Sequence, residues 1–333
     1  MAGPIGTGRD QGDRRRAAYA FEEHGRPTAR RLLMALDPQL GVLEHLEHLT
    51  PRLPGLPAVV RASLPDPDGG PSRQVYGRGA TADDALVCAV SAGFERHCAD
   101  VMVRQGEMAG VALTTGSRVR VDPFLLLDRC GLGCSRELPG AIEHAALEAS
   151  ERKAMASSLS SGTFGPRLEE SSAPPDIGAI IDWHRGRACQ VTSVLIDREP
   201  PVVACIAIPA VDDQAAVIGV AAARTGAAAW RAAAMEMHMV FIARARRDRL
   251  GELRHGGVPI EAGEAVAIDG AWACTRAELQ AALALSRRSI DSSTIAPWSR
   301  TIAGVAVDLS TAAANSMDRK VAAVALGESP DVW

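Results

Sequence analysis

Two groups of glutamate and arginine residues have the side chains that metal and phosphate binding requires. Glu95 is followed by Arg96, and Glu148 is followed by Glu151 and Arg152. A spacing of three places Glu148 and Glu151 on one face of a helix, where two carboxylates could hold a divalent cation or arrange a phosphate-bound metal. The same spacing is also typical of a solvated charged face, so the elements that position these residues must decide between the two interpretations.

The composition is that of a globular protein. The chain has 333 residues, 47% of them apolar and 23% charged, with a formal net charge of -4. These values exclude a disordered or fibrous protein. Aromatic residues make up only 4%, and only two residues are lysine, which is consistent with a GC-rich genome. A mildly acidic chain with few aromatic residues is a poor candidate for nucleic-acid binding.

The familiar short motifs are absent from the sequence. There is no P-loop, no GxGxxG after a strand, no HExxH and no GxSxG. The seven cysteines form no CxxC pair, and the spacing of Cys130 and Cys134 does not suit zinc, so we expect no metal centre and reduced thiols. No apolar signal segment or membrane-length apolar run occurs, which predicts a cytoplasmic location without a membrane span.

Residues 1–28 read as a mobile arm, and we expect residues 29–333 to form a single domain. Thr81 is a predicted N-cap, followed by Asp83 and Asp84 in the first helical turn. Residues 157–176, rich in Ser, Gly and Pro, predict a long loop. The other expected elements are helices at 28–36, 81–103, 138–157 and 225–250, and strands at 53–64, 117–121, 190–196, 201–208, 215–220, 301–309 and 320–326. Their interleaving predicts an α/β or α+β fold with mixed sheets and flanking helices.

Several segments, taken in order, resemble the YcaO family. These are LPGLPAVVRASLP, VYGRGATADDALVCAVSAGFERHCA, GLGCSRELPGAIEHAALEASERKAM, PPVVACIAIPAVDDQAAVIGVAAARTGAAAWRAAAMEM and VAVDLSTAAANSMDRKVAAVALGES, which together extend over roughly residues 50–328. The resemblance implies a YcaO-like fold. It also implies binding of ATP and Mg²⁺ and phosphorylation of a peptide-backbone amide oxygen, after which a nucleophile attacks to give an azoline, a thioamide or an amidine.

The first motif of the family, S-x-x-x-E-x-x-E-R, is only partly kept. Its positions fall on Cys88, Ala92, Glu95 and Arg96. A thiol therefore replaces the hydroxyl, and one metal carboxylate is missing. The resemblance implies that Glu95 and Arg96 belong to a residual nucleotide and Mg²⁺ site.

The second motif, N-x-x-x-E-x-x-Q-x-x-x-x-E-x-x-E-R, keeps its last three positions, Glu148, Glu151 and Arg152. Its Asn, first Glu and Gln fall on Arg136, Gly140 and Glu143. Arg136 could compensate by contacting phosphate directly. In the later helix Arg231 and Glu236 are plausible matches, with Met239 where the family has Gln. The retained carboxylates and arginines could equally persist as buried structural ion pairs.

We therefore predict a YcaO-like partner or scaffold with impaired ATP binding in the biosynthesis of a ribosomal peptide natural product, of azoline, azole or thioamide type. Its expected partners are a precursor peptide and a leader-peptide-binding or catalytic YcaO protein, in a homodimer or hetero-complex. The alternative is a divergent active enzyme in which Arg136 and Glu143 have rearranged roles. A fold-retaining module that binds another small molecule is a third interpretation.

Overall fold

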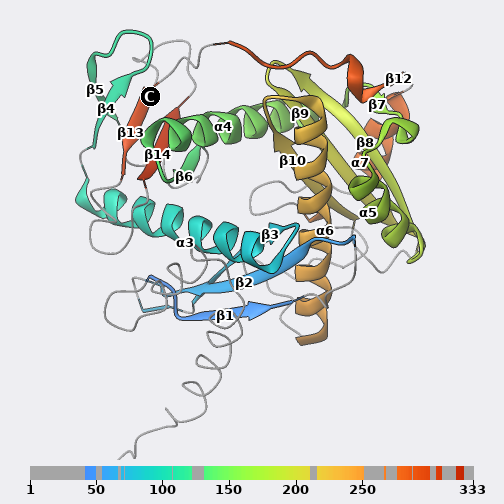
Figure 1. Cartoon of the computed structure of the whole chain (residues 1–333), viewed down its shortest axis with the longest axis horizontal. Coiled ribbons are helices and arrows are strands. Elements are labelled where there is room, and N and C mark those ends of the chain that lie inside the picture. The colour runs from blue at the N-terminus through green and yellow to red at the C-terminus, as the bar shows by residue number, and fades with distance from the viewer. Residues whose placement is uncertain are drawn as a thin grey trace, which may run out of the picture.

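The computed structural model describes residues 42–49, 55–66, 69–70, 72–106, 108–121, 131–210, 216–250, 266–267, 276–286, 288–300, 305–309 and 320–325. Three β-sheets and the helices between them make up this part of the chain (Figure 1). The expected arm at 1–28 and the expected helix at 28–36 lie outside the described residues. No helix among the described residues is long and apolar enough to cross a bilayer.

The first sheet is antiparallel and carries the helix that holds Glu95. It pairs β1 (His45–His48), β2 (Ala58–Leu64) and β3 (Arg73–Gly79) in that order, and α3 (Ala82–Gln105) packs on it. Thr81 accepts a hydrogen bond from the Asp84 N–H at 3.1 Å, which confirms the predicted N-cap. Gly77 allows the close contact of strand and helix, because a Cβ there would lie 2.1 Å from the Ala85 carbonyl oxygen.

A second, five-stranded sheet packs on the other side of α3. Its order is β5 (Arg118–Val121), β4 (Met108–Ala112), β13 (Val305–Asp308), β14 (Lys320–Ala325) and β6 (Leu132–Ser135). The core around α3 combines side chains of both sheets, so this helix lies between them. The opposite face of the second sheet is covered by the first half of α4 (Leu138–Ser161), which lies on β6 and β14.

The third sheet has six strands, in the order β11 (Val266–Ala267), β10 (Ala216–Ala222), β9 (Pro201–Pro209), β8 (Cys189–Arg198), β7 (Arg167–Leu168) and β12 (Ser289–Ile290). All nine residues of β9 are buried. One face packs against α5 (Pro175–Arg185) and α6 (Gly226–Leu250). The other face packs against the second half of α4 and against α7 (Arg276–Leu285). Because α4 contacts two sheets, its Glu-rich middle lies where they meet.

The long predicted elements are confirmed, with small shifts at their ends. The predicted helices at 81–103, 138–157 and 225–250 correspond to α3, α4 and α6, and each of the seven predicted strands has a counterpart. The mixed α/β class is confirmed as well.

The predicted loop at 157–176 is shorter than expected, because helices take up both of its ends. Helix α4 continues to Ser161, where Ser160 and Ser161 donate to the carbonyls of Ser157 and Ser158. β7, a 3-10 turn (Glu170–Ser172) and the start of α5 at Pro175 then follow. Serine hydroxyls that bond to the preceding turn tolerate helix, and Pro is well suited to a first helical position.

Candidate functional site

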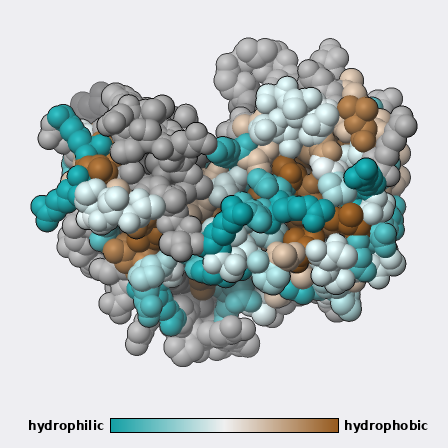
Figure 2. Space-filling view, turned by 90° about the horizontal axis from the view of Figure 1, so that it is seen from above, coloured by the Kyte–Doolittle hydropathy of each residue, from teal (hydrophilic) through white to brown (hydrophobic). Residues whose placement is uncertain are grey.

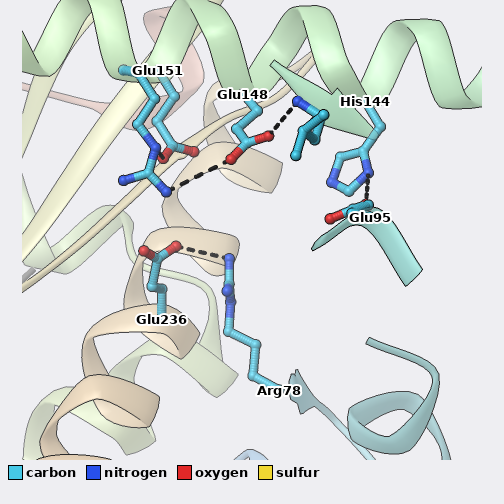
Figure 3. Close-up of polar contacts among 8 residues, drawn as sticks. Arg78, Glu95, His144, Glu148, Glu151 and Glu236 are labelled. Carbon is cyan, nitrogen blue, oxygen red and sulfur yellow. Dashed lines mark hydrogen bonds and ion pairs between the residues drawn. The ribbon is translucent and has the colours of Figure 1, made fainter. Parts of the chain in front are cut away.

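Charged side chains from four elements point into one space, as Figure 3 shows. Glu95 comes from α3, Glu148 and Glu151 from α4, and Glu236 from α6. Two arginines accompany them, Arg78 from β3 and Arg152 from α4. We call these six residues the carboxylate cluster. It brings together glutamates of three helices, and Glu95 is more than 50 residues before Glu148 along the chain.

The outer end of the carboxylate cluster is formed by Glu95 and Glu148. The Glu95 carboxylate lies 3.6 Å from Nδ1 of His144, which is one helical turn before Glu148 on α4. Glu148 accepts a hydrogen bond from the backbone N–H of Leu132, at 2.9 Å. One carboxylate oxygen of Glu148 is therefore already committed to the start of β6.

The inner end is formed by Glu151, whose carboxylate is largely buried. Arg152 lies between two carboxylates, 3.8 Å from Glu151 and 3.7 Å from Glu148. The pKa of Glu151 is raised well above its ordinary value of 4.5, because burial disfavours the charged form. The negative charges of Glu236 and Glu148 raise it further, and Arg152 and Arg78 oppose them. Burial and the two neighbouring carboxylates therefore make Glu151 harder to ionise than a carboxyl group in water.

Arg78 forms an ion pair with Glu236, at 2.9 Å, below Glu148 and Glu151 in the view of Figure 3. The side chains of Arg78 and Glu236 are 24% and 6% exposed, so the carboxylate is buried while water still reaches part of the arginine. Sequence reasoning missed Arg78. The available signal was the alternation along β3, in which Val75, Gly77 and Gly79 face α3 and Arg78 must face the opposite side.

Cys88 lies beside this ion pair, on the face of α3 that also carries Glu95. The pKa of its thiol is raised by burial, while the charge and the backbone N–H of Arg78 act in the opposite direction. A protonated thiol offers a metal or a phosphate much less than a carboxylate does.

As arranged, these residues do not fit a divalent cation. Among the described residues, no three His, Cys, Asp or Glu side chains come together closely enough to hold one. Glu236 faces Arg78, and Glu148 faces both Arg152 and the Leu132 N–H. Two guanidinium groups thus supply the positive charge that would otherwise come from a metal.

Several other sequence candidates lie outside the carboxylate cluster. Arg96 donates to the backbone carbonyl of Gln74 at 2.8 Å, which ties α3 to β3. Glu143 pairs with Arg224 at 2.7 Å, and Arg231 pairs with Asp176 between α6 and α5. Arg136 is exposed just before α4. Met239, at the position where the family has Gln, is 1% exposed and packs into the core beside the third sheet.

The comparisons with known proteins identify the fold. No family model and no curated protein matches the sequence. Among solved structures, a heterocyclase in complex with substrate and cofactor matches with a TM-score of 0.70 over 90% of this chain, at 12% identity. This chain spans about half, 52%, of the length of that heterocyclase.

Two further solved structures agree with the first. YcaO from Methanopyrus kandleri, bound with AMPPCP and Mg²⁺, matches with a TM-score of 0.63 and 17% identity, over 94% of this chain and 89% of that one. The E. coli microcin synthetase complex matches with a TM-score of 0.56 and 11% identity, over 86% and 87% of the two chains. The chain therefore has a YcaO-like fold, as the sequence predicted.

Proposed function

We propose that this chain is a YcaO-like component of ribosomal peptide natural-product biosynthesis, and that it acts as a partner or scaffold subunit with impaired ATP binding. The fold supports the pathway, since solved proteins of similar fold include a heterocyclase and a microcin synthetase. One observation supports the impaired ATP binding: the carboxylates of Glu236, Glu148 and Glu151 lie beside arginines of the same cluster.

The missing ligand types support the same proposal. Cys88, Ala92, Gly140 and Met239 stand where the resembled motifs have polar or acidic residues. Hydrogen bonds to charged groups contribute about 1.5–3 kcal/mol each, so the loss of three removes about 4–9 kcal/mol if they are roughly independent. A micromolar ligand has a total binding free energy of only about 8 kcal/mol. Binding of ATP and Mg²⁺ should therefore be weak or absent.

Calorimetric titration of the purified chain with ATP and Mg²⁺ tests the proposal. We expect no binding heat and no rise in melting temperature. Arg224→Met, which breaks an exposed ion pair outside the carboxylate cluster, should behave as the wild type does. ATP hydrolysis with ordinary turnover that is abolished by Glu151→Ala would overturn the proposal.

The role as a partner is tested separately. The proposed partners are a precursor peptide and a YcaO protein with intact motifs, with or without a separate leader-peptide-binding protein, and the assembly is a homodimer or a hetero-complex. Reconstitution of peptide modification with and without this chain should show that the catalytic partner requires it. Equal modification in its absence would exclude a scaffold role.

A second candidate function is a divergent, active ATP-dependent enzyme that phosphorylates a peptide-backbone amide for cyclodehydration, thioamidation or amidine formation. The convergence of Glu95, Glu148, Glu151 and Glu236 on one space favours it (Figure 3). It requires Arg78 to leave Glu236 when nucleotide binds. Protection by ATP and Mg²⁺ that Arg78→Met and Glu148→Gln both abolish would support this candidate over the first.

A further inference from the structure

Among the described residues, one corner of the five-stranded sheet has an uncovered face. In the antiparallel pair of β4 and β5, Ala109 lies opposite Arg120 and Val111 lies opposite Arg118. Directly opposed residues share a face, so these four side chains lie together. All four are exposed, and Val111 is one of two exposed large hydrophobic residues in the described part of the chain, at 43%.

The uncovered face results from the position of α4. This helix lies on β6 and β14 and buries Ala306 of β13, but β4 and β5 extend past its end (Figure 1). The other face of the same strands is closed, because Met108 and Val121 pack into the core around α3. At this end of the molecule, hydrophilic side chains project beside hydrophobic ones (Figure 2).

The corner also contains a groove. Its volume is about 450 Å³, and it is lined by Met108, Ala109, Arg118, Val119 and Arg120. β5 is the last strand in its sheet order, so among the described residues only β4 pairs with it. The outer edge of such a strand presents a row of backbone N–H and C=O groups to which an extended peptide can add as a further strand.

We propose that β5 and its exposed face bind an extended peptide segment with acidic residues at every second position. Arg118 and Arg120 are two residues apart, which places their side chains roughly 6.6–6.8 Å apart along one face. Acidic side chains at alternate positions of an added strand have the same spacing. The intervening residues of the peptide would lie on the face of Val119 and Val121 and should be apolar or small.

The charges select this occupant over a second copy of the chain. Charged residues on an edge strand disfavour pairing with a like-charged strand, so two copies of β5 would place arginine against arginine. An acidic strand turns the same charges into cross-strand ion pairs. The proposal goes beyond the proposed function, because it involves no residue of the carboxylate cluster.

The test is fluorescence anisotropy with a labelled peptide of alternating Asp and Val. Three further peptides serve as controls: the same composition with Asp and Val in separate blocks, a version with Pro at alternate Val positions, and an alternating Lys and Val peptide. The proteins are the full chain, Arg118→Glu/Arg120→Glu, and the matched control Arg198→Glu/Arg288→Glu, whose arginines are exposed elsewhere in the described part of the chain.

We expect the alternating acidic peptide to bind the wild type and the control variant equally. Binding should weaken roughly tenfold in the Arg118→Glu/Arg120→Glu variant, since two exposed ion pairs are lost. That variant should instead bind the Lys and Val peptide, and an unchanged melting temperature would show that it folds. The Pro-containing peptide should bind weakly, because it cannot pair with a strand edge.

Three results would overturn the proposal. The first is equal binding of the alternating and block peptides, which would indicate charge attraction without strand pairing. The second is unchanged binding in Arg118→Glu/Arg120→Glu, and the third is no binding by the wild type. None of these results depends on ATP. A negative result for peptide binding at β5 would not affect the scaffold proposal. ATP turnover would refute the scaffold proposal without bearing on peptide binding at β5.

Discussion

Replacement of Arg78 by methionine tests whether this guanidinium compensates a buried negative charge. Arg78 is the ion-pair partner of Glu236 at 2.9 Å, and the Glu236 side chain is only 6% exposed. Arg78→Met keeps a long apolar stem but leaves the Glu236 carboxylate close to Glu151, whose pKa it already raises. The variant should therefore be clearly less stable than the wild type.

The expected magnitude follows from the burial of the pair. Removing one partner of a buried ion pair costs about 3–5 kcal/mol, because the other charge stays buried without compensation. Arg78 is 24% exposed, so water can partly replace it, and the lower end of about 3 kcal/mol applies. At roughly 2 °C per kcal/mol for a chain of this size, the melting temperature should fall by roughly 6 °C.

Urea denaturation of four proteins measures the effect: the wild type, Arg78→Met, Glu236→Met and the double variant. The double variant removes both charges, so it should be more stable than the two single losses predict, with a coupling of about 2–3 kcal/mol. Arg224→Met, which breaks the exposed pair with Glu143, should cost much less. A loss below about 1 kcal/mol in Arg78→Met, with no coupling, would refute the reasoning.

Three further changes give sharp expectations. The pKa of Glu151 is raised by burial and by Glu236, so its stabilising contribution is full below pH 4.5 and is lost as the pH rises through the raised pKa. In urea denaturation, Glu151→Gln should therefore be more stable than the wild type at neutral pH and similar to it in acid. The pKa of His184 is lowered to about 3 by burial, so its contribution to the free energy of unfolding is present above pH 6.5 and is lost as the pH falls toward 3. His184→Leu should lose less stability than the wild type over that range, and an equal loss in the two proteins would contradict this. Gly77→Ala places a methyl group 2.1 Å from the Ala85 carbonyl oxygen and should cost about 3 kcal/mol by thermal unfolding.

Long elements could be predicted because their signals are local. Thr81 and the acidic turn after it determine where α3 begins, and the valine- and isoleucine-rich run of β9 is buried at every position. Short elements depend on distant partners instead. The two residues of β7 are a strand because Arg167 pairs with Val194 of β8 on one side and with Ser289 of β12, more than 100 residues later in the chain, on the other. Nothing in residues 157–176 indicates either pairing.

Only the local part of the carboxylate cluster could be predicted from the sequence. Helical spacing correctly indicated that Glu148 and Glu151 share a face, but spacing does not say which helix or strand that face meets. Arg231 illustrates this limit, since it is only five residues before Glu236 and yet points to Asp176 on α5. The partner of Glu236 comes from β3, and only the three-dimensional arrangement identifies it.

The charge balance of the carboxylate cluster determines which ligands it can accept. Arg78 pairs with Glu236, Arg152 lies beside Glu148 and Glu151, and burial raises the pKa of Glu151, so the two guanidinium groups offset much of the negative charge without a metal. A dication that entered would have to displace an arginine from Glu236 or Glu148, and each displaced guanidinium would need a new anionic partner. Phosphates could supply that partner, but Cys88 and Ala92 provide no carboxylate to complete the coordination of the metal. Internal ion pairs and missing oxygen ligands are therefore two independent physical reasons for the proposed loss of Mg²⁺ binding, and restoring a single ligand should not recover it.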